Sequence, residues 1–154
     1  MRSAFRVQRF RFKVSGSRFR FQVKDCMKIE RFEDLEVWKE SRELCIFIKE
    51  ITNTESFSKD FRFRDQIKAS SGSIMDNIAE GFERDGKKEF IQFLSIAKGS
   101  CGETRSQCYR ALDYKYISKE TLDQLLEKTI KLSKKISSFI TYLKNSDLKG
   151  TKYQ

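Results

Sequence analysis

The stretches SIMDNIAEGFER, residues 73–84, and KKEFIQFLSIAKGSCGETRSQ, residues 87–107, decide the fold of this chain. In each, apolar residues recur at the three- and four-residue spacing of an amphipathic helix. Glycine in a helix interior is destabilising by about 0.5–1 kcal/mol relative to alanine, so we expect a compensating close contact where small residues gather. The positions expected to form this close packing between the two helices are Ser71, Gly72, Gly99 and Gly102.

Helical periodicity extends over four segments that are joined by short connections. The pattern predicts an all-α fold, an antiparallel up-down-up-down four-helix bundle over residues 27–146, followed by a flexible tail over residues 147–154. In the first helix, Glu33 and Asp34 are expected in the opening turns, where negative charge suits the helix dipole. The four segments are expected at about 33–53, 60–82, 87–114 and 118–145.

Three residues are candidates for marking the helix ends. Ser118 is a favourable N-cap residue for the last helix, because its hydroxyl can accept from a free backbone N–H. Gly86 is expected to cap the third helix. The second helix is expected to stop at Gly81 or at Gly86, since glycine is common just past a helix end.

Residues 1–26 differ from the rest of the chain. They carry eight Lys or Arg and one acid, a net charge of +7, whereas residues 27–154 carry 24 basic and 21 acidic residues, a net charge of +3. Phenylalanine and valine alternate with basic residues on both sides of Ser15-Gly16-Ser17, which predicts a β-hairpin. This basic extension has three interpretations: translated upstream sequence with Met27 as the natural start, a loose or edge-pairing appendage, or a nucleic-acid-binding arm.

Several function classes are excluded by residues that the sequence lacks. It has no histidine, which removes Ser-His-Asp and Cys-His nucleophiles and the Glu-x-x-His di-metal bundles. It has no phosphate-binding glycine loop and no apolar run of membrane-spanning length. We therefore expect a cytoplasmic protein without catalytic residues, metal, cofactor or small-molecule substrate. The four cysteines are expected to be reduced apolar fillers: Cys26, Cys45, Cys101 and Cys108.

Two sets of polar residues are candidates for function. The first is a structural hydrogen-bond network or a partner-contacting site, formed by Asn77, Glu80, Glu103 and Gln107. The second is basic, and is either an ordinary solvated face or a surface that follows nucleic-acid phosphates. Its three clusters are Arg62, Arg64 and Lys68; Arg84, Lys87 and Lys88; and Lys128, Lys131, Lys134 and Lys135.

Four stretches together resemble a bacterial family of four-helix-bundle proteins described as 23S rRNA intervening-sequence proteins. The likeness covers nearly all of residues 30–144, and residues 1–26 have no counterpart in it. The family usually has Ser-Ile-Pro-Ser before Asn-Ile-Ala-Glu-Gly, whereas this chain has SIMD at 73–76, so its second helix is expected to be straighter. The stretches are FEDLEVWKESREL at 32–44, IKASSGSIMDNIAEGFER at 67–84, KKEFIQFLSIAKGSCGETRSQ at 87–107 and ALDYKYIS at 111–118.

The resemblance implies a protomer that assembles with copies of itself, in a ring of five, and it implies no catalytic activity. The chain is also similar to the accessory protein of diversity-generating retroelements, which binds nucleic acid and a reverse transcriptase. Two hypotheses follow: a non-enzymatic homo-oligomer that binds RNA or a ribonucleoprotein, or a scaffold that adapts a protein such as a reverse transcriptase. Some aromatic residues are expected at interfaces, namely among Trp38, Phe47, Phe57, Phe61 and Tyr109.

Overall fold

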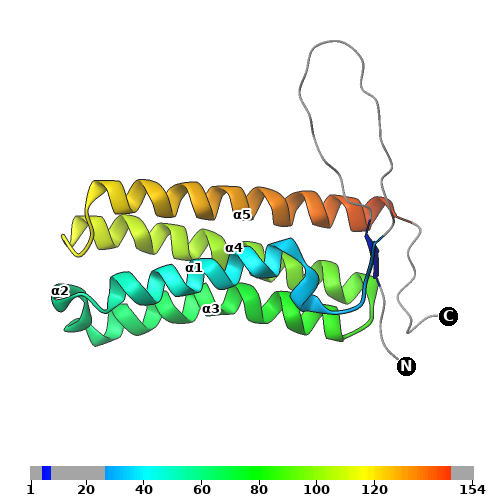
Figure 1. Cartoon of the computed structure of the whole chain (residues 1–154), viewed down its shortest axis with the longest axis horizontal. Helices are drawn as coiled ribbons and strands as arrows, with labels where there is room; N and C mark the ends of the chain where they lie inside the picture. The colour runs from blue at the N-terminus through cyan, green and yellow to red at the C-terminus, as the bar shows by residue number, and fades with distance from the viewer. Residues whose placement is uncertain (1–4, 8–26, 147–154) are drawn as a thin grey trace, which may run out of the picture.

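The computed structural model of the chain describes residues 5–7 and 27–146, and its four long helices lie side by side (Figure 1). The predicted helical bundle is confirmed. A short helix, α2 (Glu55–Ser58), lies between the first two long helices, and a 3-10 turn (Phe32–Asp34) precedes the first. The long helices are α1 (Glu36–Thr52), α3 (Phe61–Glu83), α4 (Lys87–Asp113) and α5 (Lys119–Asn145).

The connections between the long helices alternate between the two ends of the bundle (Figure 1). α2 and the turn from α4 to α5 lie at one end, which we call the α2 end. The turn from α3 to α4 lies at the opposite end, together with the start of α1 and the end of α5. Residues far apart in the sequence therefore share each end of the molecule.

The start of the first helix differs from the prediction. Glu33 and Asp34 belong to the 3-10 turn, and α1 begins at Glu36 after an extended Leu35. Leu35 is buried in the core, so tertiary packing fixes this boundary. The expected N-caps are confirmed: Ser118 Oγ accepts from the N–H of Thr121 at 3.2 Å, and Gly86 caps α4.

Two short strands lie outside the predicted elements. β1 (Phe5–Val7) pairs antiparallel with β2 (Met27–Ile29), with Phe5 opposite Ile29. The predicted hairpin falls on residues 8–26, and the predicted tail falls on residues 147–154. Both lie outside the described residues, so the three interpretations of the basic extension stay open.

The core is built from the predicted helical stripes. Its fully buried side chains come from every long helix and from α2, which contributes Phe57. Buried hydroxyls are satisfied within their own helices: Thr52 donates to the carbonyl of Ile48, and Thr129 to that of Leu125, each at 2.8 Å. The four-residue step back to the carbonyl allows threonine at core positions without an unpaired polar group.

The expected close packing at Gly72, Gly99 and Gly102 is wrong within the protomer. A Cβ placed on Gly99 or Gly102 would meet no described atom within 4 Å, and one on Gly72 would meet only its own helix's Asp76 Oδ2, at 4.0 Å. Close approach occurs instead at Gly81, where a Cβ would lie 2.5 Å from the Cβ of Phe93. Ser71 is buried, as the stripe predicts.

The turn from α3 to α4 also departs from the prediction, because neither Gly81 nor Gly86 ends the helix in the left-handed region. Asp85 takes that conformation, with φ 58°. α3 continues through Gly81 to Glu83, and Gly86 has an extended backbone. Aspartate is among the residues that tolerate a left-handed φ, which explains why glycine is not required here.

The buried thiols make stability depend on pH. Burial raises the pKa of Cys101 to about 11 and that of Cys108 to about 12, above the ordinary 9.0. The folded state then holds protons that the unfolded state releases, so the free energy of unfolding should fall as pH rises from about 9 to about 12. Urea unfolding across this range checks it. Other side chains also lose protons in this range, so the control is the variant Cys101→Ala/Cys108→Ala. Its free energy of unfolding should fall less steeply with pH than that of the unmodified protein. An equally steep fall in both proteins contradicts the prediction.

Candidate nucleic-acid interface

The three basic clusters do not form one patch. Arg62, Arg64 and Lys68 lie in the first turns of α3, at the α2 end. The cluster around the α3–α4 turn lies at the opposite end, and the four lysines of α5 lie along the middle of that helix. Any nucleic acid that contacts more than one cluster of a protomer has to extend along the bundle.

The lysines of α5 are partly neutralised by α1. Lys135 Nζ lies 2.5 Å and Lys131 Nζ 3.4 Å from Glu40 Oε1, which is itself largely covered. Lys128 and Lys131 line a small hollow together with Glu40 and Glu43. Lys128 and Lys134 are exposed and have no acidic partner in the described part of the chain. Since one carboxylate balances only one of the two lysines it contacts, the cluster keeps a positive surplus, and Lys128 and Lys134 are its unpaired members.

The cluster at the α3–α4 turn mostly serves the fold. Arg84 Nη2 lies 2.5 Å from Glu80 Oε1, and its guanidinium lies 4.7 Å from the centre of the Phe93 ring. Lys87 Nζ donates to the carbonyl of Ser146 at 2.5 Å, which links α4 to the end of α5. Lys88 is exposed. Only part of this cluster is available to a ligand.

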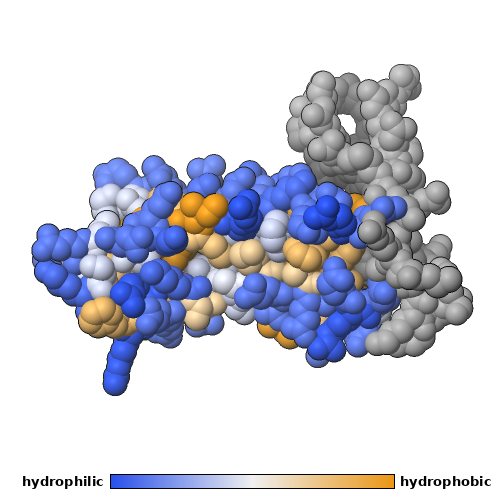
Figure 2. Space-filling view, turned by 60° about the horizontal axis from the view of Figure 1, so that its bottom comes forward, coloured by the Kyte–Doolittle hydropathy of each residue, from blue (hydrophilic) through white to orange (hydrophobic). Residues whose placement is uncertain are grey.

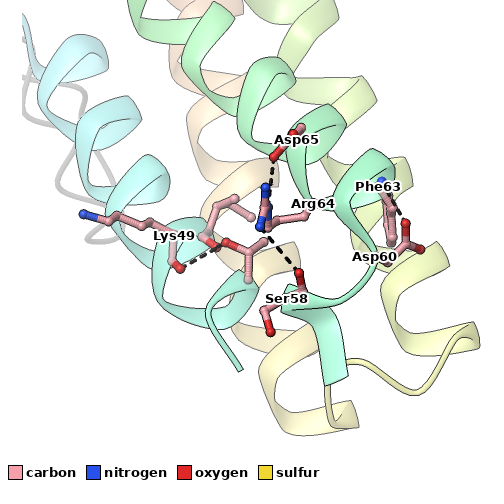
Figure 3. A network of polar contacts seen from close by, with 8 residues as sticks. Lys49, Ser58, Asp60, Phe63, Arg64 and Asp65 are labelled. Atoms are coloured by element: carbon pink, nitrogen blue, oxygen red, sulfur yellow. Dashed lines mark hydrogen bonds and ion pairs between the residues drawn. The ribbon is translucent and has the colours of Figure 1, made fainter. Parts of the chain in front are cut away.

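The first turn of α3 has a defined polar geometry, shown in Figure 3. Asp60 Oδ1 accepts from the N–H of Phe63 at 3.1 Å and so caps the helix. The guanidinium of Arg64 donates to Asp65 Oδ1 at 2.9 Å and to the carbonyl of Ser58 at 3.4 Å. It also lies 4.9 Å from the ring centre of Phe61. Arg64 is thus fixed in place beside an exposed aromatic ring.

A cluster of aromatic rings adjoins this turn at the α2 end. The ring of Phe63 contacts Phe57, Tyr116 and Tyr114, with centroid distances of 5.1, 6.2 and 5.8 Å. The Arg110 guanidinium lies 3.9 Å from the centre of the Phe63 ring. Tyr116 Oη donates to Asp60 Oδ2 at 3.1 Å, which joins the α4–α5 turn to the cap of α3. Sequence reasoning missed this cluster, although Tyr114 and Tyr116 lie in the ALDYKYIS motif.

A ladder of polar side chains runs along the contact between α3 and α4. Ser70 Oγ lies 2.6 Å from Gln107 Oε1, and Gln107 Nε2 donates to Glu103 Oε1 at 3.0 Å. Further along, Asn77 Nδ2 donates to the Ser73 carbonyl at 2.7 Å, and Ser73 Oγ lies 3.0 Å from Ser100 Oγ. Three of the four predicted network residues, Asn77, Glu103 and Gln107, therefore lie on this ladder.

Glu80, the fourth predicted network residue, lies elsewhere. It forms the exposed i, i+4 ion pair with Arg84 on α3. Three small residues bridge the helices in its place, namely Ser70, Ser73 and Ser100. Their hydroxyls form hydrogen bonds across the contact between α3 and α4. A network whose polar groups all have partners helps to define helix register.

The aromatic residues expected at interfaces differ in exposure. Phe57 of α2 is fully buried, so it is not among the residues that can form an interface. Trp38 and Phe47 are partly buried against the core. Phe61 and Tyr109 are 64% and 50% exposed.

A further surface lies between α1 and α3. Figure 2 turns the lower side of Figure 1 toward the viewer and shows pale and orange residues along the bundle between blue borders. Ile46 of α1 is exposed. An open, mostly apolar groove is lined by Cys45, Lys49, Lys68, Ser71, Gly72 and Met75.

Comparison with known proteins places the chain in a family. The family described as "23S rRNA-intervening sequence protein" matches residues 33–138, more than half of the chain. The chain belongs to this family. A crystal structure of a member of the S23 ribosomal protein family from Bacteroides thetaiotaomicron, a protein with unknown function, is similar to it. The two share 26% identity and a TM-score of 0.62, covering 68% of this chain and 97% of that one.

No curated protein matches this member of the 23S rRNA-intervening sequence family. Among residues 5–7 and 27–146, no helix is both long and apolar enough to cross a membrane. Within the same residues, no three Cys, Asp or Glu side chains gather as metal ligands would.

Proposed function

We propose that this family member is a non-enzymatic homo-oligomer of antiparallel four-helix protomers, which binds RNA or a ribonucleoprotein through its basic surface. The observation that carries the proposal is a set of exposed or half-exposed cations without an acidic partner among the described residues. Such cations can release counterions from phosphates. The family's link to 23S rRNA supports RNA as the polyanion. The cations are Arg62, Lys88, Lys128 and Lys134.

Self-association is the second part of the proposal, and it would strengthen RNA binding. The open groove between α1 and α3, together with the exposed Ile46 of α1, offers apolar area that a second protomer can cover. The family resemblance favours a ring of five. A ring repeats each basic cluster and raises avidity without any new contact. Light scattering tests this: a mass of at least twice 18.2 kDa supports self-association, and a mass of 18.2 kDa contradicts it.

Removing the positive charges of Lys128 and Lys134 is expected to weaken RNA binding and to make the affinity less dependent on salt. In Lys128→Gln/Lys134→Gln, the plot of the log of the binding constant against log salt concentration should become shallower. Its slope should decrease in magnitude by about 0.7–0.9 for each phosphate that is no longer neutralised. Filter binding across a salt series measures this slope. The matched control is Lys39→Gln/Lys98→Gln, since both lysines are exposed and lie outside the clusters. RNA binding that barely responds to salt in the unmodified protein contradicts the proposal.

A second candidate function is a scaffold that adapts a protein such as a reverse transcriptase, without binding nucleic acid itself. The exposed apolar side chains Ile46 and Ile96 favour it, because such surface suits protein contacts. A purified reverse transcriptase that stays bound after RNase treatment supports the scaffold. Loss of the partner on RNase treatment supports RNA binding.

A further inference from the structure

We propose that the α2 end of the bundle is a stacking platform for unpaired RNA bases, with Phe61 and Tyr114 as the stacking rings and Arg62, Arg64 and Arg110 as the phosphate-binding groups. This inference rests on the proposed RNA-binding function and specifies which surface reads which kind of RNA.

Exposure of aromatic rings is concentrated at this end. Phe61 is 64% and Tyr114 53% exposed, which makes them the two most exposed large apolar side chains of the described residues. They come from the first turn of α3 and the end of α4, and both lie next to an arginine-bearing turn. A buried role for these rings in the protomer is excluded by their exposure.

The Phe61 ring is held by charged neighbours. Arg64 lies 4.9 Å from its centre, and Arg64 is anchored to Asp65 and to the carbonyl of Ser58 (Figure 3). Arg62 is exposed beside it and has no ion-pair partner among the described residues. An exposed ring that is held against an anchored guanidinium group loses little conformational entropy when a base stacks on it.

The Tyr114 ring is oriented by a tight turn and by other rings. Its edge-on contacts with Phe63 and Tyr116 both have a centroid distance of 5.8 Å. Lys115, with φ 59°, reverses the chain, and the N–H of Tyr116 bonds back to the carbonyl of Ala111 at 2.9 Å. These contacts fix one side of the ring and leave the other to solvent.

Arg110 adds an unused hydrogen-bond donor to this site. Its Nη2 donates to Gln66 Oε1 at 2.7 Å, and its guanidinium covers Phe63. Its Nε is buried and has no partner among the described residues. The residue as a whole is half-buried, so the guanidinium N–H groups that do not bond Gln66 are the ones left for a phosphate oxygen.

Unpaired RNA is the partner that fits this combination. Every base has a π-face that stacks on an aromatic ring, and guanidinium groups bind phosphates and also stack. In a duplex the bases are already stacked on each other, so the rings gain nothing from it. The charges at this end are of mixed sign, including Asp60 and Asp65, so the proposed binding needs the rings as well as phosphate attraction.

The test compares oligouridylate of about ten nucleotides with a blunt RNA duplex of equal phosphate count, by fluorescence anisotropy on the full chain. The protein is expected to prefer the unpaired RNA. Phe61→Ala/Tyr114→Ala should weaken oligouridylate binding by about 10–100-fold, since stacking contributes about 1–3 kcal/mol per base. Its affinity for the duplex should stay within about twofold.

Two controls separate stacking from structure. Phe61→Tyr/Tyr114→Phe keeps an aromatic ring at both positions and should bind oligouridylate as the unmodified protein does. Ile96→Ala removes an exposed apolar side chain from the middle of α4, away from this end, and should change neither affinity. If the double alanine variant binds oligouridylate normally, or loses both RNAs equally, the platform is refuted while RNA binding stands. If the unmodified protein binds neither RNA, the proposed function fails as well.

Discussion

Gly81→Ala is expected to destabilise the bundle by up to about 2 kcal/mol, although alanine is the better helix former. A Cβ at this position would lie 2.5 Å from the Cβ of Phe93 and 3.0 Å from Cδ2 of Phe90. The Cβ of Phe93 is fixed to the backbone of α4, so α3 and α4 have to separate. Overpacking of this kind costs about 1–3 kcal/mol, and the gain in helix propensity of about 1 kcal/mol offsets only part of it.

Gly99→Ala is the matched comparison, because Gly99 is also inside a helix but meets no described atom within 4 Å of a built Cβ. This variant should be more stable than the unmodified protein by about 0.5–1 kcal/mol. Urea unfolding of both variants measures whether each substitution raises or lowers the free energy of unfolding. Equal destabilisation by both variants would contradict the geometry of the protomer. A Gly99→Ala protein that unfolds normally but loses oligomeric mass would place Gly99 against a neighbouring protomer.

The glycine contacts show how far periodicity can predict packing. The buried stripe of α3 passes through Ile67, Ile74 and Gly81 at seven-residue intervals, so the signal for Gly81 is present in the register. Gly99 and Gly102 fall off the α4 stripe, which Ala97 and Cys101 mark. Small size alone does not tell which face of a helix a residue occupies. Position relative to the buried stripe does tell this, and it separates Gly81 from Gly99 and Gly102. The same stripe predicts the helices and most of the core.

The candidate site is less predictable because it depends on contacts between distant residues. Lys135 belongs to a basic cluster in the sequence, but Glu40, which accepts from it, lies 95 residues earlier. The arginine and ring cluster joins Arg110 to Gln66, and Tyr116 to Asp60, across two helices. Local spacing carries no information about such pairs. A cluster of basic residues in a sequence therefore indicates a binding surface only after the acidic residues that pair with it in the fold are known.

Phe90→Ala is expected to have the largest effect on stability, a loss of about 3–5 kcal/mol. The ring is fully buried and lies edge-on to Phe82 and Phe139, at centroid distances of 5.9 and 5.5 Å. It therefore joins α3, α4 and α5, and its removal leaves a cavity that all three helices line. Natural domains are stable by only about 5–15 kcal/mol, so this variant should unfold at much lower urea concentration. The control is Phe93→Ala, whose half-exposed ring should contribute far less.

Combining the two substitutions tests the geometry directly. Phe90→Ala removes the Cδ2 atom that crowds position 81, but the Cβ of Phe93 stays 2.5 Å away. Gly81→Ala should therefore destabilise the Phe90→Ala protein less than it destabilises the unmodified protein, though not by zero. Residues in contact commonly couple by about 0.5–3 kcal/mol, which a double-mutant cycle resolves. Strict additivity would show that Phe90 does not restrict the approach of α3 to α4, and that the contact at Gly81 depends on the backbone of α4 alone.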